Sequence, residues 1–368
     1  MAKLCLAGAL VVARPTRAAE PAQPATTPSE SKPAEAPKTL AVGKRGTLGF
    51  GALLQVWGFW QRQADESGTT FRVRRSELKL KGELVPEVVA FDVMVDPAKV
   101  LEPENVTVPV ENQEPPPTTP GSVTVSQPSG AISMLQDAFV TFRSPYADVT
   151  AGQFKLPLSL EGYRSSAKLL FPERALVSRR YGDKRDIGVR VDKQLGPVYY
   201  NLGIYNGQGQ NRLDTNDQKD LAARFEAKPI PELTLAVAGA LAVGERDTEP
   251  SKDRLEGDAR FELAGFLAQG EYIRAWDGPT GDRTRGHGTY AALGYRILDL
   301  QPIVRVGRLE PDLDGDGQGV DDAVNHYEIG ANYYWLEQEV RFGLSASWFD
   351  YDDAPVRTEV IALAQASF

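Results

Sequence analysis

The chain ends in the ten residues Glu359–Phe368, EVIALAQASF. Side chains alternate between two faces of an extended strand, so Val360 and Phe368 belong to one apolar face of this segment. Most chains end in a frayed polar tail, whereas this one ends on an aromatic residue inside an alternating pattern. In a closed barrel the last strand pairs with the first and leaves no free edge. The C-terminus therefore predicts a barrel whose final strand stops at Phe368.

Alternating segments of this kind recur along the whole chain from Gly46 onward, separated by turn signals. Short connections alternate with long ones, as an up-and-down antiparallel transmembrane β-barrel requires. The sequence therefore predicts an all-β barrel of about sixteen strands, with one long connection folded inward. The expected strands are 47–62, 70–84, 87–97, 132–144, 146–155, 186–195, 197–206, 219–228, 231–244, 253–264, 266–276, 286–297, 299–309, 324–334, 337–350 and 356–368. The expected long connections are 63–69, 98–131, 156–185, 207–218, 245–252, 277–285, 310–323 and 351–355.

Composition divides the chain into three parts. Residues 1–18 combine Lys3, an apolar run and small residues before a cleavage point, which indicates a signal peptide. Residues 19–46 are rich in Pro, Ala, Thr and Glu and are expected to be a flexible linker, followed by the barrel at 47–368. The single cysteine, Cys5, lies in the signal, and the formal charge of −9 disfavours nucleic-acid binding. No later stretch reaches the ~20 apolar residues of a membrane helix.

Several motifs resemble one family of outer-membrane proteins. The segment 71–84, FRVRRSELKLKGEL, is similar to the second-strand motif of the phosphate-selective porin O and P family. The segments 135–140 (LQDAFV) and 151–158 (AGQFKLPL) resemble its central motifs, and Ser165-Ser166, 172–174 (PER) and 206–209 (NGQG) follow at similar spacing. The resemblance covers about 47–368.

The resemblance implies a homotrimeric porin of sixteen strands in the outer membrane of a Gram-negative bacterium, with a preference for anions such as phosphate. The implied partners are outer-membrane lipid and lipopolysaccharide, small anionic or hydrophilic solutes, and the barrel-assembly machinery, which would read the terminal Phe368. Neither a cofactor nor a metal is expected. The segment 312–317, DLDGDG, matches only the first half of an EF-hand loop, because Ala323 stands where the bidentate Glu is required.

The expected inward loop, 156–185, reverses the sign of charge of the chain, with seven basic and three acidic residues. Lys and Arg in a narrow, low-dielectric channel favour anions, and the guanidinium fork suits phosphate or carboxylate. Each loop cation either lines the channel or pins the loop to a wall carboxylate. The candidate pore-lining or anion-binding residues are Arg75, Lys79, Lys155, Arg164, Lys168, Arg174, Arg179, Arg180, Arg185 and Arg190.

The polar face of the expected strands also carries acids, which makes the lumen mixed in charge. The candidate pore-wall acids are Asp92, Asp137, Glu256, Asp258, Glu271 and Glu328. The facing of Arg74 stays open: alternation points it outward if Leu78 faces lipid, whereas a β-bulge would turn both Arg74 and Arg75 inward.

Three other functions compete with a selective porin. The first is a barrel with little selectivity for general hydrophilic solutes. The second is a barrel enzyme such as a lipase, for which His287 and His326 have no evident serine partner. The third is a soluble secreted β protein that binds sugars. A TonB-linked transporter is disfavoured, because the linker is too short for a plug and the barrel is too small.

Overall fold

The computed structural model describes residues 39–42, 45–101, 103–109, 122–128, 134–244, 251–279, 283–313, 323–336, 339–352 and 354–368. One compact unit, Lys38–Phe368, contains all of them. The barrel strands are β2 (Gly46–Gln63), β3 (Glu66–Val85), β4 (Val89–Val95), β7 (Leu135–Phe142), β8 (Asp148–Lys155), β9 (Arg185–Leu195), β10 (Val198–Tyr205), β11 (Lys219–Ile230), β12 (Leu233–Val243), β13 (Ser251–Leu263), β14 (Phe266–Gly278), β15 (Thr284–Tyr295), β16 (Leu300–Glu310), β17 (Val324–Trp335), β18 (Val340–Tyr351) and β19 (Arg357–Ser367).

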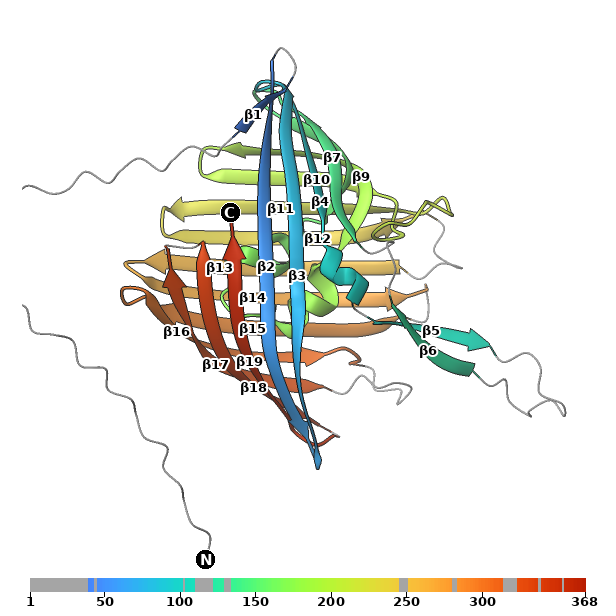
Figure 1. Ribbon diagram of the computed structural model, residues 1–368. Helices are drawn as coiled ribbons and strands as arrows, with labels where there is room; N and C mark the ends of the chain where they lie inside the picture. Colours follow the sequence, from blue (N-terminus) through green and yellow to red (C-terminus); the bar gives the residue numbers. More distant parts are fainter. Residues whose placement is uncertain are drawn as a thin grey trace, which may run out of the picture. The chain divides into compact units, whose positions relative to one another are not determined.

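These sixteen strands form a closed antiparallel barrel, as predicted. Each strand pairs with its neighbours along the chain, and β19 pairs with β2 to close the ring. The C-terminus lies beside β2 (Figure 1), and the Phe368 N–H and C=O both bond to Ala52 at 3.1 Å. The chain thus ends on Phe368 at the point where the last strand completes its pairing with the first.

Short and long connections lie at opposite ends of the barrel, as predicted, except for one connection that was predicted to be long. At one end of the barrel, the short-turn end, every connection has at most five residues; the other end, the long-loop end, carries most of the longer ones. The predicted long connection 63–69 is wrong, because β2 and β3 continue to Gln63 and Glu66 and only two residues join them. The backbone ladder continues there through Glu66–Thr70, a polar stretch that lacks the apolar alternation of the other strands.

Three short strands lie outside the predicted set. Within the predicted connection 98–131, β5 (Pro103–Pro109) and β6 (Ser122–Pro128) pair with each other, after a 3₁₀ turn at Pro97–Leu101. Within the predicted linker, β1 (Thr39–Val42) pairs with the start of β2. The predicted signal peptide and the linker up to residue 38 lie outside the described residues.

The two faces of the barrel wall differ in chemistry. On β12 the apolar side chains of Leu235 and Val237 point outward and are 43% and 59% exposed, whereas Ala236 and Ala238 point inward and are buried. The other strands repeat the pattern, with arginine and carboxylate side chains common on the inward face. Such a wall suits lipid outside and water inside. Within the described part of the chain, no helix is long and apolar enough to cross a membrane.

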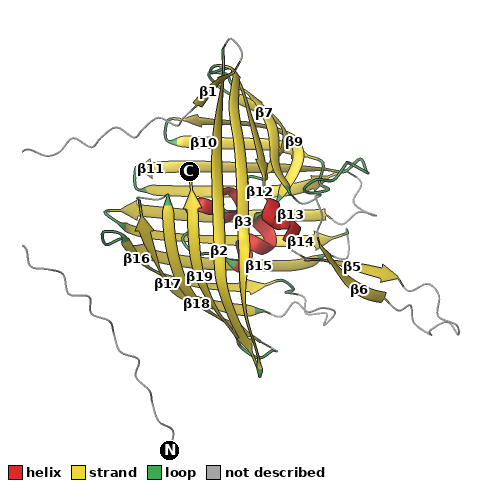
Figure 2. Ribbon diagram, in the orientation of Figure 1, coloured by secondary structure: helices red, strands yellow, loops and turns green. Residues whose placement is uncertain are grey.

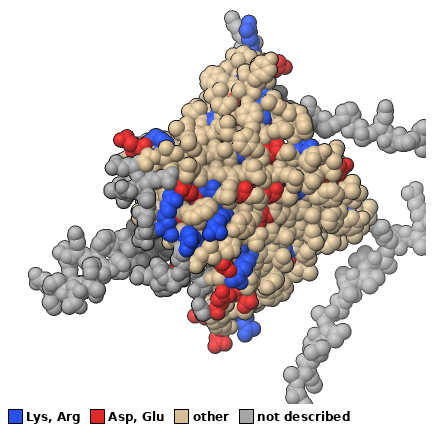
Figure 3. Space-filling model, turned by 180° about the vertical axis from the view of Figure 1, so that it is seen from behind, with Lys and Arg blue, Asp and Glu red and all other residues tan. Residues whose placement is uncertain are grey.

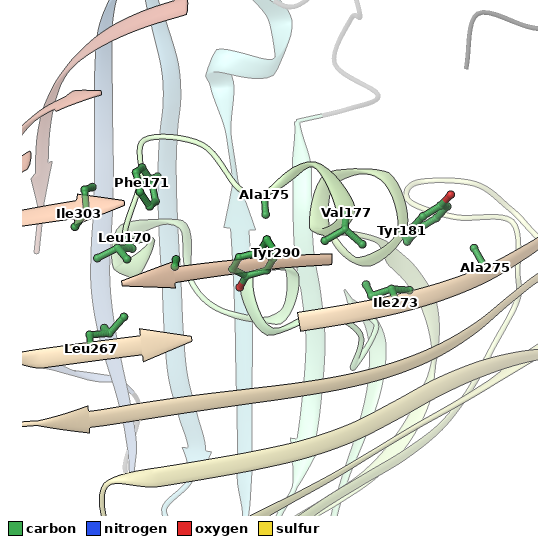
Figure 4. Close-up of a cluster of buried hydrophobic side chains, with 11 residues drawn as sticks. Leu170, Phe171, Ala175, Val177, Tyr181, Leu267, Ile273, Ala275, Tyr290 and Ile303 are labelled. Atoms are coloured by element: carbon green, nitrogen blue, oxygen red, sulfur yellow. The ribbon is translucent and has the colours of Figure 1, made fainter. Parts of the chain in front are cut away.

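The connection after β8 enters the barrel, as predicted. Figure 2 shows its short helices among the barrel strands. Phe171, Ala175 and Val177 of this connection pack against Tyr290 and Ile303 on β15 and β16, and Figure 4 shows this buried cluster. Apolar packing therefore holds a chain segment of mixed charge against one side of the inner wall.

Candidate functional site

The connection 156–184, called here the inward segment, has its own compact structure. It contains α1 (Leu160–Tyr163), a 3₁₀ turn at Ser166–Lys168 and a π-helical turn at Ser178–Gly182. Its two ends meet at Ser159 and Gly182, where a Cβ added to Gly182 would lie 2.0 Å from the Ser159 Cβ. Only glycine fits this approach, so the segment closes on itself as it enters the lumen.

Two wall carboxylates hold the beginning of the inward segment. Glu271 on β14 accepts hydrogen bonds from the Ser159 hydroxyl at 2.9 Å, the Leu160 N–H at 2.6 Å and the Ser178 hydroxyl at 3.2 Å. Glu256 on β13 accepts from the Ser159 N–H at 2.5 Å. Helix N-termini leave N–H groups without intrahelical partners, and the oxygen atoms of these two side chains accept hydrogen bonds from them. Glu256 and Glu271 thus serve as anchors.

The middle of the inward segment is held by Glu173, which lies between Arg74 and Arg75 of β3. The Glu173 carboxylate is 2.8 Å from Arg74 and 3.0 Å from Arg75. A β-bulge opposite Gln55 and Val56 places both arginines inside, which answers the question the sequence left open. Burial opposes ionisation of Glu173, but the guanidinium groups of Arg75 and Arg74 outweigh it and hold its pKa well below the usual range.

A chain of buried polar groups links this anchor to the seam where β19 meets β2. Arg75 donates to the Gln55 Oε1 at 2.6 Å, and the Gln55 amide donates to the Gln365 Oε1 at 2.7 Å. Arg341 donates to the same Gln365 oxygen at 2.9 Å and to the Leu169 carbonyl. Polar groups of four strands around the closing seam therefore form one network, in which β3, β18 and β19 bond to the inward segment.

The segment's other two acids are also engaged. Glu161 accepts from the Gln269 amide at 2.9 Å and from the Ala175 N–H at 2.7 Å, and it lies 3.5 Å from Arg305. Asp183 lies 3.0 Å from Arg174.

Asp183 keeps its charge in this buried place. Burial raises the pKa of its carboxyl, but the charges of Lys155, 3.4 Å away, and Arg174 outweigh it and lower the pKa to about 2. All three acids of the inward segment are thus held in contacts with the wall or within the segment itself.

The predicted basic residues of the segment differ in whether they have a partner. Arg174 is buried and pairs with Asp183, and Arg185, at the start of β9, pairs with Asp137 at 2.9 Å. Arg180 is exposed and hydrogen-bonded to Tyr181. The remaining four form no ion pair with any described residue: Arg164, which is half-buried, and Lys168, Arg179 and Lys184, which are exposed.

These cations line cavities on both sides of the inward segment. A cavity of about 940 Å³ at the long-loop end is lined by Arg72, Arg74, Arg179 and Arg357, and a second of about 680 Å³ by Arg180, Lys184, Lys252 and Arg254. A third, of about 530 Å³ at the short-turn end, is lined by Arg164, Lys168, Arg260 and Arg296. Lys and Arg gather in one region of the surface in Figure 3, while most of the surrounding wall is uncharged.

Most of the predicted residues on the wall lie in ion pairs with other wall residues of opposite charge. Each predicted acid also lies on the inward face of its strand. The pairs are Lys79 with Glu77, Asp92 with Lys81, Arg190 with Asp192, Glu256 and Asp258 with Arg224, and Glu328 with Arg305.

Sequence reasoning missed several cavity-lining cations. Arg72 lies beyond the bulge, which reverses the alternation by which its facing would be read. Arg357 begins the last strand, and Arg254 lies on the polar face of β13, where the alternating pattern pointed to it. The missed residues are Arg72, Lys252, Arg254, Arg296 and Arg357.

A closed sixteen-stranded barrel with an apolar exterior and a charged inward segment defines an outer-membrane channel. The model of the family "Phosphate-selective porin O and P" matches residues 54–259, and the chain belongs to this family. The predicted porin, its outer-membrane location and the preference for anions that the family assignment carries are thereby confirmed. Family and fold indicate a channel rather than an enzyme.

Solved structures show the same fold. An anion-selective porin from Comamonas acidovorans matches with a TM-score of 0.62 and 10% identity, covering 88% of this chain and 100% of that chain. The outer-membrane channel DcaP of Acinetobacter baumannii matches with a TM-score of 0.61 and 12% identity, covering 89% and 99%. OmpT of Vibrio cholerae, in a trimer form, matches with a TM-score of 0.59 and 12% identity, covering 88% and 100%. No curated protein matches the chain.

Proposed function

We propose that the chain is a passive porin whose preference for anions arises from the cations of the inward segment. The observation that carries this proposal is that the acidic side chains of the segment have partners, whereas several of its basic side chains have no ion-pair partner among the residues that the structure describes. Its acids Glu161, Glu173 and Asp183 are held in anchoring contacts. Its cations Lys168 and Arg179 remain exposed in cavities on opposite sides.

The wall ion pairs contribute little to the sign of the charge in the channel, because in each pair a carboxylate lies beside the guanidinium. Arg224, for example, lies 3.1 Å from Glu256 and 2.7 Å from Asp258. The excess charge therefore comes from the loop cations, whose field is focused by the low-dielectric wall. An anion would enter at the long-loop end, exchange part of its hydration for Lys and Arg contacts, and leave through the short-turn cavity.

The chemistry of these contacts favours oxyanions. A guanidinium presents two parallel N–H groups that match carboxylate or phosphate oxygens. Diffusion through such a channel uses neither a cofactor nor a covalent step. The solutes proposed are small anions such as phosphate, together with small hydrophilic solutes.

Assembly follows from the same comparison. The OmpT structure of Vibrio cholerae is described as a trimer form, and we extend that state to this chain as a homotrimer. Its apolar exterior would contact outer-membrane lipid and lipopolysaccharide, and Phe368 would be read by the barrel-assembly machinery.

The test is the zero-current potential of the detergent-refolded barrel in a planar bilayer under a KCl gradient. An anion-signed potential that falls when phosphate is added, because phosphate occupies the loop cations, is the expected result. A potential near zero or of cation sign would contradict the proposal and favour a general porin with little selectivity.

A further inference from the structure

The 940 Å³ cavity at the long-loop end has an unusual lining. Several of its arginines lie over aromatic rings. The Arg72 guanidinium carbon is 4.7 Å from the ring centre of Trp57 and 4.6 Å from that of Phe59. Arg357 lies 4.3 Å from the ring centre of Phe349. Two faces of this cavity, on β2–β3 and on β18–β19, thus carry the same pairing of a flat cation with a flat ring.

This pairing orients the cations. A guanidinium held against a ring is fixed in plane, and a flat π system is a favourable partner for a guanidinium face. Arg72 is exposed and lines the cavity, so part of its guanidinium is accessible from the lumen. Arg179 projects into the same cavity and has no ion pair among the residues described. The cavity therefore combines an oriented flat surface with a nearby positive charge.

The cavity at the short-turn end is built differently. Among its described cations only Arg296 lies over a ring, 4.4 Å from the centre of Tyr334. Lys168 and Arg164 there have no aromatic contact in the described part of the chain. The long-loop cavity thus has ring-backed cations on two of its faces, whereas the short-turn cavity has one among the described residues that line it, Arg296, and the positive charge there comes mainly from cations without a ring contact.

The volume and the apolar lining of the long-loop cavity also favour an organic ligand. A volume of about 940 Å³ lies in the range of pockets for drug-sized organic ligands and far exceeds what one inorganic phosphate fills. Phe59, Leu176 and Ile361 add apolar surface between the charged groups. We propose that this cavity is a binding subsite for planar organic anions, such as aromatic carboxylates, an inference that rests on the anion channel proposed above.

In this subsite the ring of the ligand stacks on the accessible guanidinium of Arg72, and its carboxylate lies toward Arg179. The ligand would be retained briefly before passing the inward segment. A charged but non-planar anion of the same size would gain the charge contact without the stacking.

The test measures block of the KCl current through single refolded channels by benzoate, by cyclohexanecarboxylate and by inorganic phosphate. Benzoate and cyclohexanecarboxylate carry the same charge and differ in planarity. Benzoate is expected to half-block at a concentration about threefold lower than cyclohexanecarboxylate, as a cation–π contribution at an accessible site implies. Half-block at the same concentration of the two acids in the wild-type channel would by itself contradict the proposed subsite.

Arg72→Lys keeps the charge and loses the flat guanidinium. It is expected to remove the advantage of benzoate over cyclohexanecarboxylate, because the Lys ammonium offers no flat face for stacking. Arg164→Lys, in the short-turn cavity, is the matched control and should retain the advantage. A benzoate advantage that survives Arg72→Lys would also overturn the assignment. The zero-current potential is read in the same channels, so a failed anion preference is distinguished from a failed subsite.

Discussion

The acids and the bases of the inward segment have opposite surroundings. Glu161 and Glu173 lie within hydrogen-bond distance of wall groups or of the segment's own backbone. Lys168 and Arg179 are exposed in the cavities, with no carboxylate partner in the described ranges. A segment of mixed charge can therefore act as a positive surface, because its negative groups are used to hold it in place.

The wall shows the complementary arrangement. Its carboxylates Glu256 and Glu271 bind the segment's backbone and hydroxyl groups, and its arginines Arg75 and Arg305 bind the segment's acids. The wall thus supplies both acidic and basic anchors for the segment. The preference of the channel for anions depends instead on segment cations that have no anchoring role. This difference between segment and wall shows that ion selectivity cannot be read from the total number of charged residues. Only the charged groups without an ion-pair partner should be counted.

Loss of the main wall anchor should have the largest effect. Glu271→Ala removes the acceptor of three hydrogen bonds, at a cost of roughly 4 kcal/mol of folding free energy. The midpoint of thermal unfolding in detergent should fall, and single-channel conductance should rise as the segment leaves its place. Glu262→Ala, an exposed carboxylate on neighbouring β13, is the control and should change neither. A normal conductance in Glu271→Ala would show that Glu271 does not hold the segment.

Removing an anchoring acid of the inward segment should increase the preference of the channel for anions. Glu173→Gln leaves Arg74 and Arg75 without their counter-charge, at a cost of about 2 kcal/mol. Because the lumen gains positive charge, the zero-current potential should move further toward the anion sign. A shift toward cations would mean that Glu173 does not neutralise these arginines in the channel.

Acidification tests the anchors by their pKa. Asp183 has a pKa lowered from 3.8 to about 2 in the folded protein, so its contribution to stability is fully present above 3.8 and is lost as the pH falls through about 2. Glu173 is shifted in the same direction. Single-channel conductance should therefore stay constant from neutral pH down to 3.8 and change below it. A change in conductance between pH 7 and 5 would mean that groups other than Asp183 and Glu173 hold the segment in place.

The smallest effect is expected for a paired wall cation. Arg190 lies 3.1 Å from Asp192 and 4.6 Å from the ring centre of Phe154. The double variant Arg190→Gln with Asp192→Asn should change the anion-to-cation permeability ratio by less than about twofold, because the ion pair that it removes carries no excess charge. Lys168→Gln, measured in the same gradient, should produce the larger shift, and the reverse order would break the distinction between paired and unpaired cations.

The barrel was predictable because its signals are local. Alternation located all sixteen barrel strands, and the terminal Phe368 indicated closure onto β2. The error occurred where pairing does not depend on an apolar face, as at Glu66–Thr70, and the facing that stayed open, that of Arg74, lies where a bulge interrupts the alternation. A single extra residue reverses every facing beyond it.

The positive sign of the inward segment was also readable, but the partner of each charge was not. Arg174 and Arg179 are five residues apart in one basic run, yet one is buried against Asp183 and the other is exposed. The wall anchors lie far away in sequence, as Glu271 does from Ser159. Such contacts depend on the register of the closed barrel, which composition and spacing do not encode.

The central claim is that the unpaired cations of the inward segment set the selectivity of the channel. It is tested most directly by the zero-current potential of a variant with Arg164, Lys168, Arg179 and Lys184 all changed to Gln. These residues form no ion pair with described residues, so the barrel should fold with its wild-type conductance. The account predicts an anion-signed potential for the wild type and one near zero for the variant. An unchanged anion-signed potential would contradict it and assign selectivity to the wall.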